Sequence, residues 1–452
     1  MPSLENNPLI PAHHRPLLQF LAEQANLLQA QIYIVGGYPR NLLLQSHAYD
    51  FDVVVVGNAP SFAAHLHRQF GGELTTHAAF GTAAWHTPQE RLSEVLRNWD
   101  DHVPHDYDPS VDMPEILEFA TTRTEIYSHP AALPTVTLID GADALERDAR
   151  RRDFTINTLA LRLAPEPFGQ LLDPLNAMSD LEAKTLRVLH ERSFIDDPTR
   201  LFRAARLLVS YRLQLAPETQ ALIPSALAYV KELSGERIRH ELDLIMRYDL
   251  SHRMLRLLDE WGVLAALEIG LRFDERLSQL FDDSFLDIDI VTDRAQASWA
   301  LWASQLADTL PLLTRLPFDR HTTENIRAVR EIPSLLSQLS LSRRNSQIYR
   351  ILRNVSGPVL AAAQAVAIFE GNQTASDAIR VYYEDLQERS PVINGNDLMN
   401  LGLKPSPLLG RLLSRLQDAV LDGVVTTPEE QRALVAQWIA EEAASSESHD
   451  RQ

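Results

Sequence analysis

The 452-residue sequence contains no cysteine, which excludes disulfide bonds and thiolate metal sites. It also lacks a membrane-spanning run of roughly 20 apolar residues, because the longest such run in its second half, VLAAAQAVAIF, is alanine-rich and too short. The N-terminus has no basic segment followed by an apolar core, the pattern of a signal peptide. We therefore expect a cytoplasmic protein with no membrane partner.

Positive charge is also scarce, and the net charge is -19 at pH 7. An acidic average disfavours nucleic-acid binding, because phosphate recognition needs a cationic surface. Net charge describes only the average field, however, and arginines are locally dense at 150–152, 200–212 and 343–353. A nucleic-acid interface therefore requires that such arginines share one face.

The first third of the chain mixes strand and helix patterns. Strands are predicted at 31–35, 50–56, 71–77, 80–87 and 116–123, where β-branched and aromatic residues cluster. Helices are predicted at 39–45 and at 60–70, with Ser61 as the N-cap of the second. From residue 196 onward, apolar residues recur at helical spacing. This order is typical of an α+β head followed by an all-α remainder.

Breaks in these patterns fall near Pro165, Arg272 and Pro391. They divide the chain into residues 1–165, 166–271, 272–390 and 391–452. A polar, acidic segment at 88–114 has no clean period and resembles an inserted surface loop. The polar composition of the last twelve residues predicts a disordered tail.

Two carboxylates, Asp50 and Asp52, flank Phe51 at the start of a predicted strand. Alternate side chains of a strand share a face, so the two carboxylates point the same way. Such neighbours repel unless a cation lies between them. The pair is explained either by a solvated strand end or by a divalent-metal site.

A Gly-Gly turn precedes this strand, in the segment GGYPR. Gly36 and Gly37 allow backbone N–H groups to approach a phosphate, and Arg40 adds a charged donor. A Gly-Gly turn is a common connector by itself. Beside the Asp50–Asp52 pair, the turn is consistent with a phosphoryl-transfer site. In such a site one part holds a triphosphate and another holds the metal that bridges its oxygens.

Two further segments supply a carboxylate and a cation. Glu118 lies on a predicted strand, where it is a surface residue, a general base on an attacking hydroxyl, or a further ligand of the metal. The segment RRRDFTINTLAL places arginines immediately before a predicted apolar helix. Arg152 either belongs to a solvated helix start, with Asp153 as its acid, or reaches a phosphate.

The segment DDPTRLFRAARLL places Asp197 and Arg200 three residues apart at a predicted helix start. Such a pair is commonly a surface salt bridge. Alternatively, an acceptor beside donors complements a base that carries an exocyclic amino group next to a ring acceptor nitrogen. Cytosine and adenine have this arrangement, whereas uracil and guanine present the opposite polarity.

These segments, in this order, resemble the class II tRNA nucleotidyltransferases and bacterial poly(A) polymerases. The family's opening pattern is matched by GGYPRNLLLQSHAYDFD, and later motifs by EFATTRTEIY, RRDFTINTLAL and DDPTRLFRAARLL. The resemblance implies a polymerase-β-like nucleotidyltransferase head with a mixed sheet, followed by an all-α neck, body and tail. It is strongest over residues 32–208 and weak from about 250 to 391.

The resemblance also implies a reaction, in which an RNA 3′-hydroxyl attacks the α-phosphate of CTP or ATP. Mg²⁺ would be held by Asp50 and Asp52, the triphosphate by Gly37, Arg40 and Arg152, and the base by Asp197 and Arg200. Arg203 and Arg206 would lie near the base. The implied partner is the 3′ end of tRNA. Whether CCA, CC or only A is added stays open, as does the oligomeric state.

Two alternatives remain: a poly(A) polymerase acting on general RNA 3′ ends, and a non-catalytic RNA-binding protein with a decayed head. Asn41 stands where the family usually has an aspartate after the arginine, so Arg40 loses a charged partner. Asp196 replaces a usual glutamate and keeps the charge. The segment 88–114 is longer than the turn usual there.

Overall fold

The computed structural model of the chain describes residues 10–46, 51–99, 114–281, 293–400 and 403–449. Its contacts group the chain into two compact units. Unit 1 comprises residues 1–237 and 260–267, and unit 2 comprises residues 238–259 and 268–452. The division into four parts at 165, 271 and 390 stays a prediction.

Seven strands of unit 1 form one sheet in the order β3-β4-β5-β2-β1-β8-β9. Only β2 and β5 pair in parallel among these described neighbours, so the predicted mixed sheet is confirmed. The strands are β1 (Gln31–Val35), β2 (Asp52–Val56), β3 (Glu73–His77), β4 (Thr82–His86), β5 (Ile116–Thr121), β8 (Ala160–Ala164) and β9 (Leu171–Leu172).

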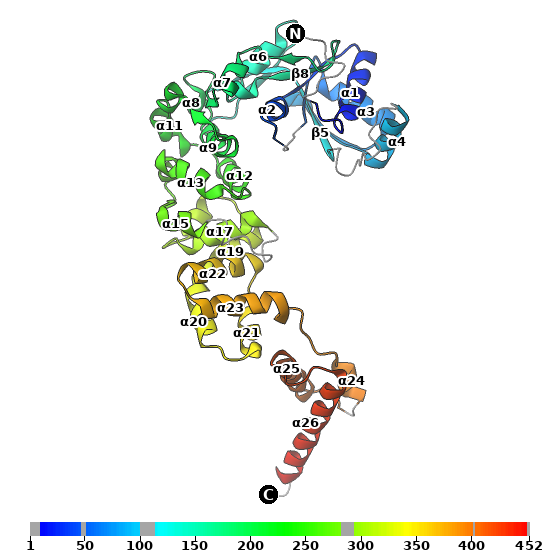
Figure 1. The fold of residues 1–452 in the computed structure, drawn as a ribbon, viewed down its shortest axis with the longest axis vertical. Helices are drawn as coiled ribbons and strands as arrows, with labels where there is room; N and C mark the ends of the chain where they lie inside the picture. Colours follow the sequence, from blue (N-terminus) through cyan, green and yellow to red (C-terminus); the bar gives the residue numbers. More distant parts are fainter. Residues whose placement is uncertain (1–9, 47–50, 100–113, 282–292, 401–402, 450–452) are drawn as a thin grey trace. The chain divides into compact units, whose positions relative to one another are not determined.

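One face of this sheet is covered by α1 (Arg15–Leu27) and α3 (Ala59–Phe70), which share a single apolar core with the strands (Figure 1). Val53 and Val55 of β2 point into that core, whereas Val54 belongs to a small cluster on the other face. The alternation follows from the two-residue period of a strand. It leaves Asp52 on the face that α1 and α3 do not cover.

An aromatic cluster lies under the start of β2. The ring centroids of His14 and Tyr38 are each 5.0 Å from that of Phe51, and the Tyr38 hydroxyl lies 3.0 Å from His14 Nδ1. Tyr38 belongs to α2 (Gly37–Leu43), the short helix that was predicted after the Gly-Gly turn. The residue between the two predicted metal ligands is therefore packed against the motif that precedes it.

The remaining elements of unit 1 are mostly short helices. They are η1 (Ala78–Phe80), α4 (Gln89–Trp99), β6 (Arg123–Ile126), β7 (Thr135–Leu138), α6 (Ala144–Arg150), η2 (Thr155–Asn157), α7 (Ala177–Glu182), β10 (Thr185–Leu186), α8 (Ser193–Asp196), α9 (Thr199–Tyr211), β11 (Gln214–Leu215), α10 (Pro217–Gln220), α11 (Ile223–Val230) and α14 (Val263–Ala266). Part of the segment 88–114 is thus helical, and its residues 100–113 lie outside the described ones.

Two local predictions were wrong. The N-cap of α3 is Asn58, whose side chain accepts a hydrogen bond from the backbone N–H of Ser61. The segment RRRDFTINTLAL does not form a helix but a 3₁₀ turn, η2, followed by β8. Leu161 and Leu163 of β8 point into the core that α1 and α3 share, Ala160 belongs to the cluster on the other face, and the pairing of β8 with β1 outweighs the local helical pattern.

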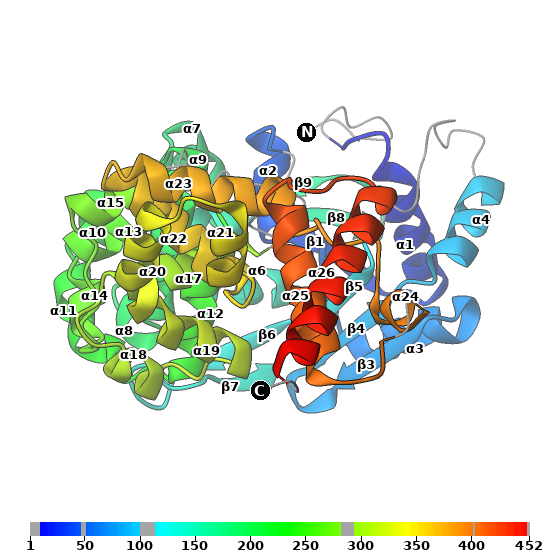
Figure 2. The ribbon, with the colours of Figure 1, turned by 90° about the horizontal axis from the view of Figure 1, so that it is seen from below.

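Unit 2 is helical, as predicted. Beyond α12 (Gly235–Met246), which begins in unit 1, its helices are α13 (Ser251–Glu260), α15 (Glu275–Leu280), α17 (Arg294–Ser304), α18 (Leu310–Arg315), α19 (Arg320–Ala328), η3 (Val329–Glu331), α20 (Ile332–Leu341), α21 (Asn345–Leu352), α22 (Gly357–Phe369), α23 (Gln373–Val381), the π-helical turn η4 (Tyr382–Leu386), α24 (Gly395–Asn400), α25 (Pro407–Leu421) and α26 (Pro428–His449). α17, α20 and α23 surround α22 (Figure 2).

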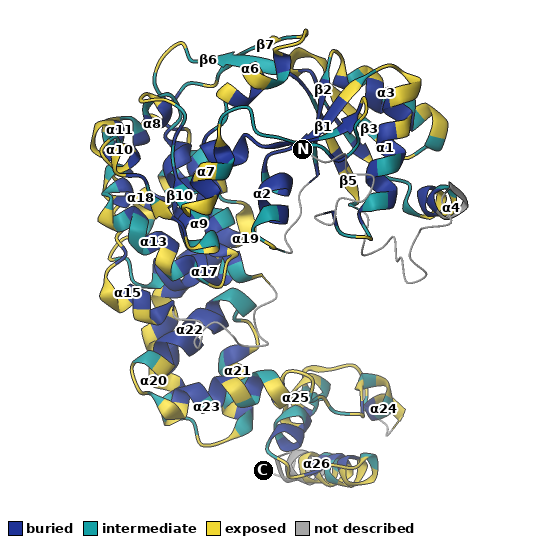
Figure 3. Cartoon of the chain, turned by 45° about the horizontal axis from the view of Figure 1, so that its top comes forward, coloured by how far each residue is buried: buried dark blue, intermediate teal, exposed yellow. Residues whose placement is uncertain are grey.

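The alanine-rich run singled out in the sequence forms α22, which is buried almost throughout (Figure 3). Among the described residues, no helix is both long and apolar enough to cross a membrane. α26 extends to His449, so most of the segment predicted to be a disordered tail is helical. Its alanines and glutamates are strong helix formers, which accounts for the difference.

The buried His14 gives the fold a specific pH dependence. Burial, and then the neighbouring His13, lower the pKa of His14 to about 4. Below pH 6.5 the unfolded chain therefore binds a proton that the folded chain excludes, and the free energy of unfolding should fall between pH 6.5 and about 4. When the free energy of unfolding is measured with urea across this range, it should change less steeply with pH for His14→Gln than for the unsubstituted protein. An unchanged slope would contradict the assignment, and His129→Gln, at an exposed histidine, is the control.

Candidate active site

Two carboxylates face each other across the parallel pair β2–β5. Asp52 is the register partner of Glu118, so both side chains project from the same face of the sheet. They line a cavity of about 370 Å³ together with Arg123, Arg151 and Arg152. The structure thus brings together two predicted site residues that are 66 positions apart in the chain (118 - 52). Asp50 lies outside the described residues.

The Gly-Gly turn closes one side of the carboxylate pair. Gly36 has φ +73°, and an added Cβ would lie 3.0 Å from Asp52 Oδ2 and 3.5 Å from Arg152 Nη1. Both the backbone conformation and the close approach therefore require glycine at this position. Gly37 follows as the first residue of α2. Gly36, Asp52 and Arg152, which the sequence placed in separate motifs, are direct neighbours.

A buried carboxylate that sequence reasoning missed holds the arginines of the motif RRRDFT. Asp148 Oδ2 pairs with Arg152 Nη2 at 3.0 Å, and Asp148 Oδ1 pairs with Arg151 Nε at 2.9 Å. Burial alone would raise the pKa of Asp148, but the two guanidinium groups outweigh it and hold that pKa below its ordinary value. The available signal was an aspartate four residues before Arg152, which a helix places beside it.

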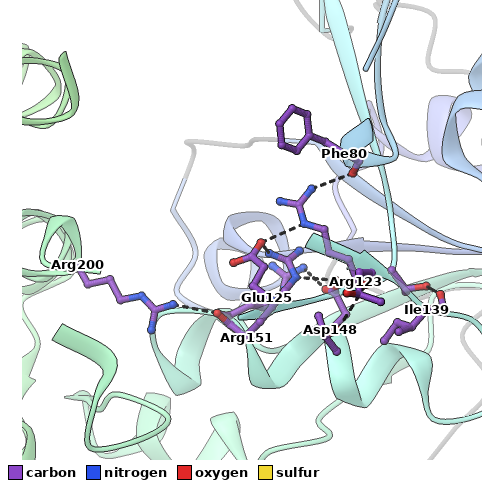
Figure 4. Close-up of polar contacts among 11 residues, drawn as sticks. Phe80, Arg123, Glu125, Ile139, Asp148, Arg151 and Arg200 are labelled. Atoms are coloured by element: carbon purple, nitrogen blue, oxygen red, sulfur yellow. Dashed lines mark hydrogen bonds and ion pairs between the residues drawn. The ribbon is translucent and has the colours of Figure 1, made fainter. Parts of the chain in front are cut away.

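A second carboxylate continues this network. Glu125 Oε1 pairs with Arg151 Nη1 at 2.8 Å and with Arg123 Nε at 3.1 Å (Figure 4). Arg123 and Glu125 lie on β6, which pairs with β7 in a hairpin outside the main sheet. Asp148 and Glu125 therefore fix three arginines along one wall of the cavity.

Arg40 does not point freely toward the cavity. It is only 7% exposed, and its guanidinium donates hydrogen bonds to Asn41 Oδ1, Asn157 Oδ1 and the Tyr211 hydroxyl, where it also stacks on the ring. These contacts favour a role in joining α2 to η2 and α9 over direct phosphate binding. Asn41 still provides an acceptor, but without the charge of an aspartate.

Asp153 is buried rather than a solvated helix-start acid. It accepts hydrogen bonds from the backbone N–H of Phe154 and from the Asn157 side chain, and it pairs with Arg203 at 2.8 Å. Arg203 of α9 is therefore used, at least in part, to hold η2. Arg206 follows three residues later on α9.

Asp197 and Arg200 do not form the surface salt bridge that was one reading of their spacing. Asp197 Oδ1 accepts hydrogen bonds from Thr199 and from Arg237 Nη2, the latter at 2.6 Å. Within the described part of the chain, Asp197 Oδ2 makes no hydrogen bond and stays available as an acceptor. The pairing fails because Asp197 precedes α9 as an extended residue, so it is not on a helical face with Arg200.

Arg200 is instead buried and reaches the segment that carries Arg151 and Arg152. It donates to Ser193 Oγ at 2.6 Å. It also donates to the backbone carbonyl of Arg151 at 3.0 Å (Figure 4). Arg237, which the sequence did not single out, also donates to the Ala131 carbonyl. The two predicted base-reading residues are thus anchored by separate contacts within unit 1.

The carboxylates that line the cavity are suitable ligands for a divalent cation. Asp52 and Glu118 supply carboxylate oxygens, the ligands that hard cations such as Mg²⁺ prefer. A complete cluster of three or more acidic or histidine ligands is not found among the described residues, which exclude Asp50. Asp52 and Glu118 both line the cavity, so both carboxylates are accessible from it.

This sheet, with paired carboxylates beside a Gly-Gly turn and an arginine wall, defines a nucleotidyltransferase head of the polymerase-β type. Three family models agree with that class: the poly(A) polymerase head domain over residues 32–187, an RNA- and SrmB-binding site of polymerase A over 212–269, and tRNA nucleotidyltransferase domain 2 over 293–437. The chain belongs to the class II tRNA nucleotidyltransferase and bacterial poly(A) polymerase family. Nucleotidyltransferases of this family depend on metal ions.

Similar proteins carry names from within this family. An A-adding tRNA nucleotidyltransferase of Geobacter sulfurreducens is 30% identical over 92% of this chain but only 46% of its own length. One from Halalkalibacterium halodurans is 28% identical over 92% of this chain and 91% of its own. The structure of the Thermotoga maritima CCA-adding enzyme complexed with tRNA is 25% identical, with a TM-score of 0.67, over 94% of this chain and 95% of that one. The chain thus spans about half the length of the Geobacter relative.

The Gly36 contact yields a sharp mutational test. In Gly36→Ala the new Cβ should displace the Asp52 carboxylate, and we expect about a 100-fold loss of nucleotidyltransferase kcat/KM, since misplacement of about 1 Å can cost this much. Gly141→Ala is the matched control, because Gly141 also has a positive φ but its Cβ would meet nothing closer than 3.9 Å. Equal activity losses in the two variants, compared at similar melting temperatures, would argue against a special role for Gly36.

Proposed function

We propose that this chain transfers CMP, AMP or both from CTP and ATP to the 3′ end of tRNA, with release of pyrophosphate. The observation that carries the proposal is the cavity in which Asp52 and Glu118 face Arg152. Support also comes from the names of relatives, which include A-adding and CC-adding tRNA nucleotidyltransferases and CCA-adding enzymes. Structures similar to this chain are described as complexes of CCA-adding enzyme with ATP and with CTP.

In the proposed reaction the 3′-oxygen of the RNA forms a bond to the α-phosphorus. The bond between that phosphorus and the oxygen bridging to the β-phosphate breaks, and pyrophosphate leaves with the electron pair. The Glu118 carboxylate accepts the proton of the attacking hydroxyl. Mg²⁺ bound by Asp50 and Asp52 would neutralise charge on the phosphate oxygens and favour ionisation of the hydroxyl.

Nucleotide binding is assigned to residues around the same cavity. Arg152, held by Asp148, neutralises the triphosphate, and the Gly36–Gly37 turn allows its oxygens to approach the backbone. Arg40 anchors α2, the helix that follows this turn, through its hydrogen bonds to Asn157 and Tyr211.

Base selection is assigned to Asp197 and Arg200. Asp197 Oδ2 would accept from the exocyclic amino group of cytosine or adenine, and a guanidinium N–H of Arg200 would donate to the adjacent ring nitrogen. Arg203 and Arg206 lie on the same helix and complete the proposed set. The cytoplasmic location stays a prediction.

A poly(A) polymerase remains the second candidate, because the family model that matches residues 32–187 describes the poly(A) polymerase head domain. The two reactions share their chemistry and differ in the acceptor. A tRNA transcript ending in CC and an unstructured RNA of equal length separate them. Addition of many AMP units to the unstructured RNA would support the poly(A) reading and oppose the tRNA one.

The function is tested by single-nucleotide addition to three tRNA transcripts: one lacking CCA, one ending in C and one ending in CC. With Mg²⁺ and CTP and ATP supplied separately and together, we expect extension of at least one transcript, and the pattern identifies a CCA-, CC- or A-adding enzyme. Chelation of the metal should abolish extension and added Mg²⁺ should restore it. Asp52→Asn is the catalytic control. Failure to extend any transcript or the unstructured RNA would favour the non-catalytic alternative.

The base-reading assignment predicts a change in selectivity. Asp197→Asn exchanges a charged acceptor for an amide that can also donate, so rejection of UTP and GTP should weaken by about 5- to 150-fold, the range expected for a base contact of about 1–3 kcal/mol. Competition assays with all four nucleotides measure the ratio of kcat/KM values. Asp196→Asn, at the neighbouring carboxylate that pairs with Arg192, is the matched control. Unchanged ratios would remove Asp197 from base selection.

A further inference from the structure

The cavity has more positive charge on its arginine wall than the wall's own carboxylates neutralise. Three guanidinium groups, of Arg123, Arg151 and Arg152, face two carboxylates, Asp148 and Glu125, so one positive charge is in excess. Asp148 is shared between Arg151 and Arg152, and Glu125 between Arg151 and Arg123. Asp52 and Glu118 line the same cavity, so the positive charge is local to this wall, where it can bind an anion.

Arg123 is the member of this wall with donors to spare. Its Nε pairs with Glu125, its Nη1 lies 3.5 Å from the carbonyl oxygen of Phe80, and its Nη2 makes no hydrogen bond with any described residue (Figure 4). Its side chain is 20% exposed and lines the cavity. Burial, and then the neighbouring Arg151, lower the pKa of Arg123, against the opposing effect of Glu125.

The position of Arg123 separates it from the residues assigned to the triphosphate. Gly36 follows β1 and lies against Asp52 and Arg152, on one side of the carboxylate pair. Glu118 lies on β5, on the other side of Asp52, and β4 is the next strand. Arg123 comes directly after β5 and reaches Phe80, which is in the connection from β3 to β4. Its guanidinium is therefore displaced from the Gly-Gly turn in the direction of Glu118 and β4.

In the proposed reaction, the acceptor 3′-hydroxyl lies beside Glu118. The phosphodiester that links the last two nucleotides of the acceptor is the nearest negative charge on that strand. We propose that Arg123 binds this phosphodiester and so holds the terminal ribose toward Glu118, with Glu125 as the residue that positions Arg123. The inference rests on the proposed function and assigns it a further substrate-binding residue.

The test pairs a protein substitution with a substitution in the RNA. Arg123→Gln removes the charge, and a methylphosphonate at the last linkage of the acceptor removes the negative charge of that phosphate. For the unsubstituted protein we expect the methylphosphonate to raise KM for RNA about tenfold. Arg123→Gln should cause a similar rise with ordinary RNA, but the methylphosphonate should then add little. KM for the nucleotide should change less than twofold throughout.

Two matched controls accompany this cycle. A methylphosphonate three linkages upstream should affect the protein and the Arg123→Gln variant equally. Arg150→Gln, at an exposed arginine of α6 that pairs with Glu146, should leave both KM values unchanged. If Arg123→Gln does not fold, as judged by its thermal unfolding, Arg123→Lys keeps the charge and should show a smaller version of the same coupling.

The outcomes separate this inference from the proposed function. If the unsubstituted protein extends no RNA, the proposed function fails before any variant is compared. If it extends RNA but the effects of Arg123→Gln and the terminal methylphosphonate simply multiply, Arg123 does not contact that phosphate. A rise in KM for the nucleotide alone would place Arg123 on the triphosphate and overturn the assignment.

Discussion

The parallel pairing of β2 with β5 is the constraint on which the candidate site depends. It sets Asp52 opposite Glu118 and turns both carboxylates to the face that α1 and α3 leave uncovered. A shift of one residue in this register would send one of the two carboxylates into the apolar core. The valines of β2 prevent such a shift, because Val53 and Val55 fill that core. The packing of the apolar side of β2 thus determines where the Asp52 carboxylate lies on its polar side.

The charges around this pair are arranged before any substrate arrives. Asp148 has no exposed surface and holds two arginines at once, and Glu125 holds Arg151 from the opposite side. Loss of one partner from such a buried group typically costs about 3–5 kcal/mol, because the remaining charges stay buried without compensation. The network therefore holds Arg152 in one position before a substrate binds. Binding then costs little additional side-chain entropy of Arg152. It also explains how a chain of net charge -19 can present a locally positive wall.

The sequence predicted most of the sheet because its strands carry strong local patterns, such as the unbroken valines of β2. It could not predict that Glu118 would face Asp52, since register between distant strands is set by the whole core. It missed Asp148, whose only local mark is its spacing from Arg152. The helix expected after RRRDFT was wrong for a related reason: β8 pairs with β1, a contact 125 residues away along the chain, as the register Val35–Ala160 shows (160 - 35). Arg40 was assigned to phosphate from its place in a motif, yet Asn157 and Tyr211 hold it within the protein.

The residues proposed to read the base show how such internal contacts can serve recognition. A carboxylate that was free on both oxygens could rotate and accept from many donors, so it would discriminate poorly. Asp197 is fixed through Oδ1 by Thr199 and Arg237, which leaves Oδ2 in one orientation. Arg200 is fixed by Ser193 and by the Arg151 carbonyl, and Arg151 itself lines the cavity that contains Asp52 and Glu118. A base that shifted Arg200 would therefore pull on the same segment that carries Arg152. In this arrangement, the proposed base site and the proposed triphosphate site are linked through two adjacent residues of one chain segment.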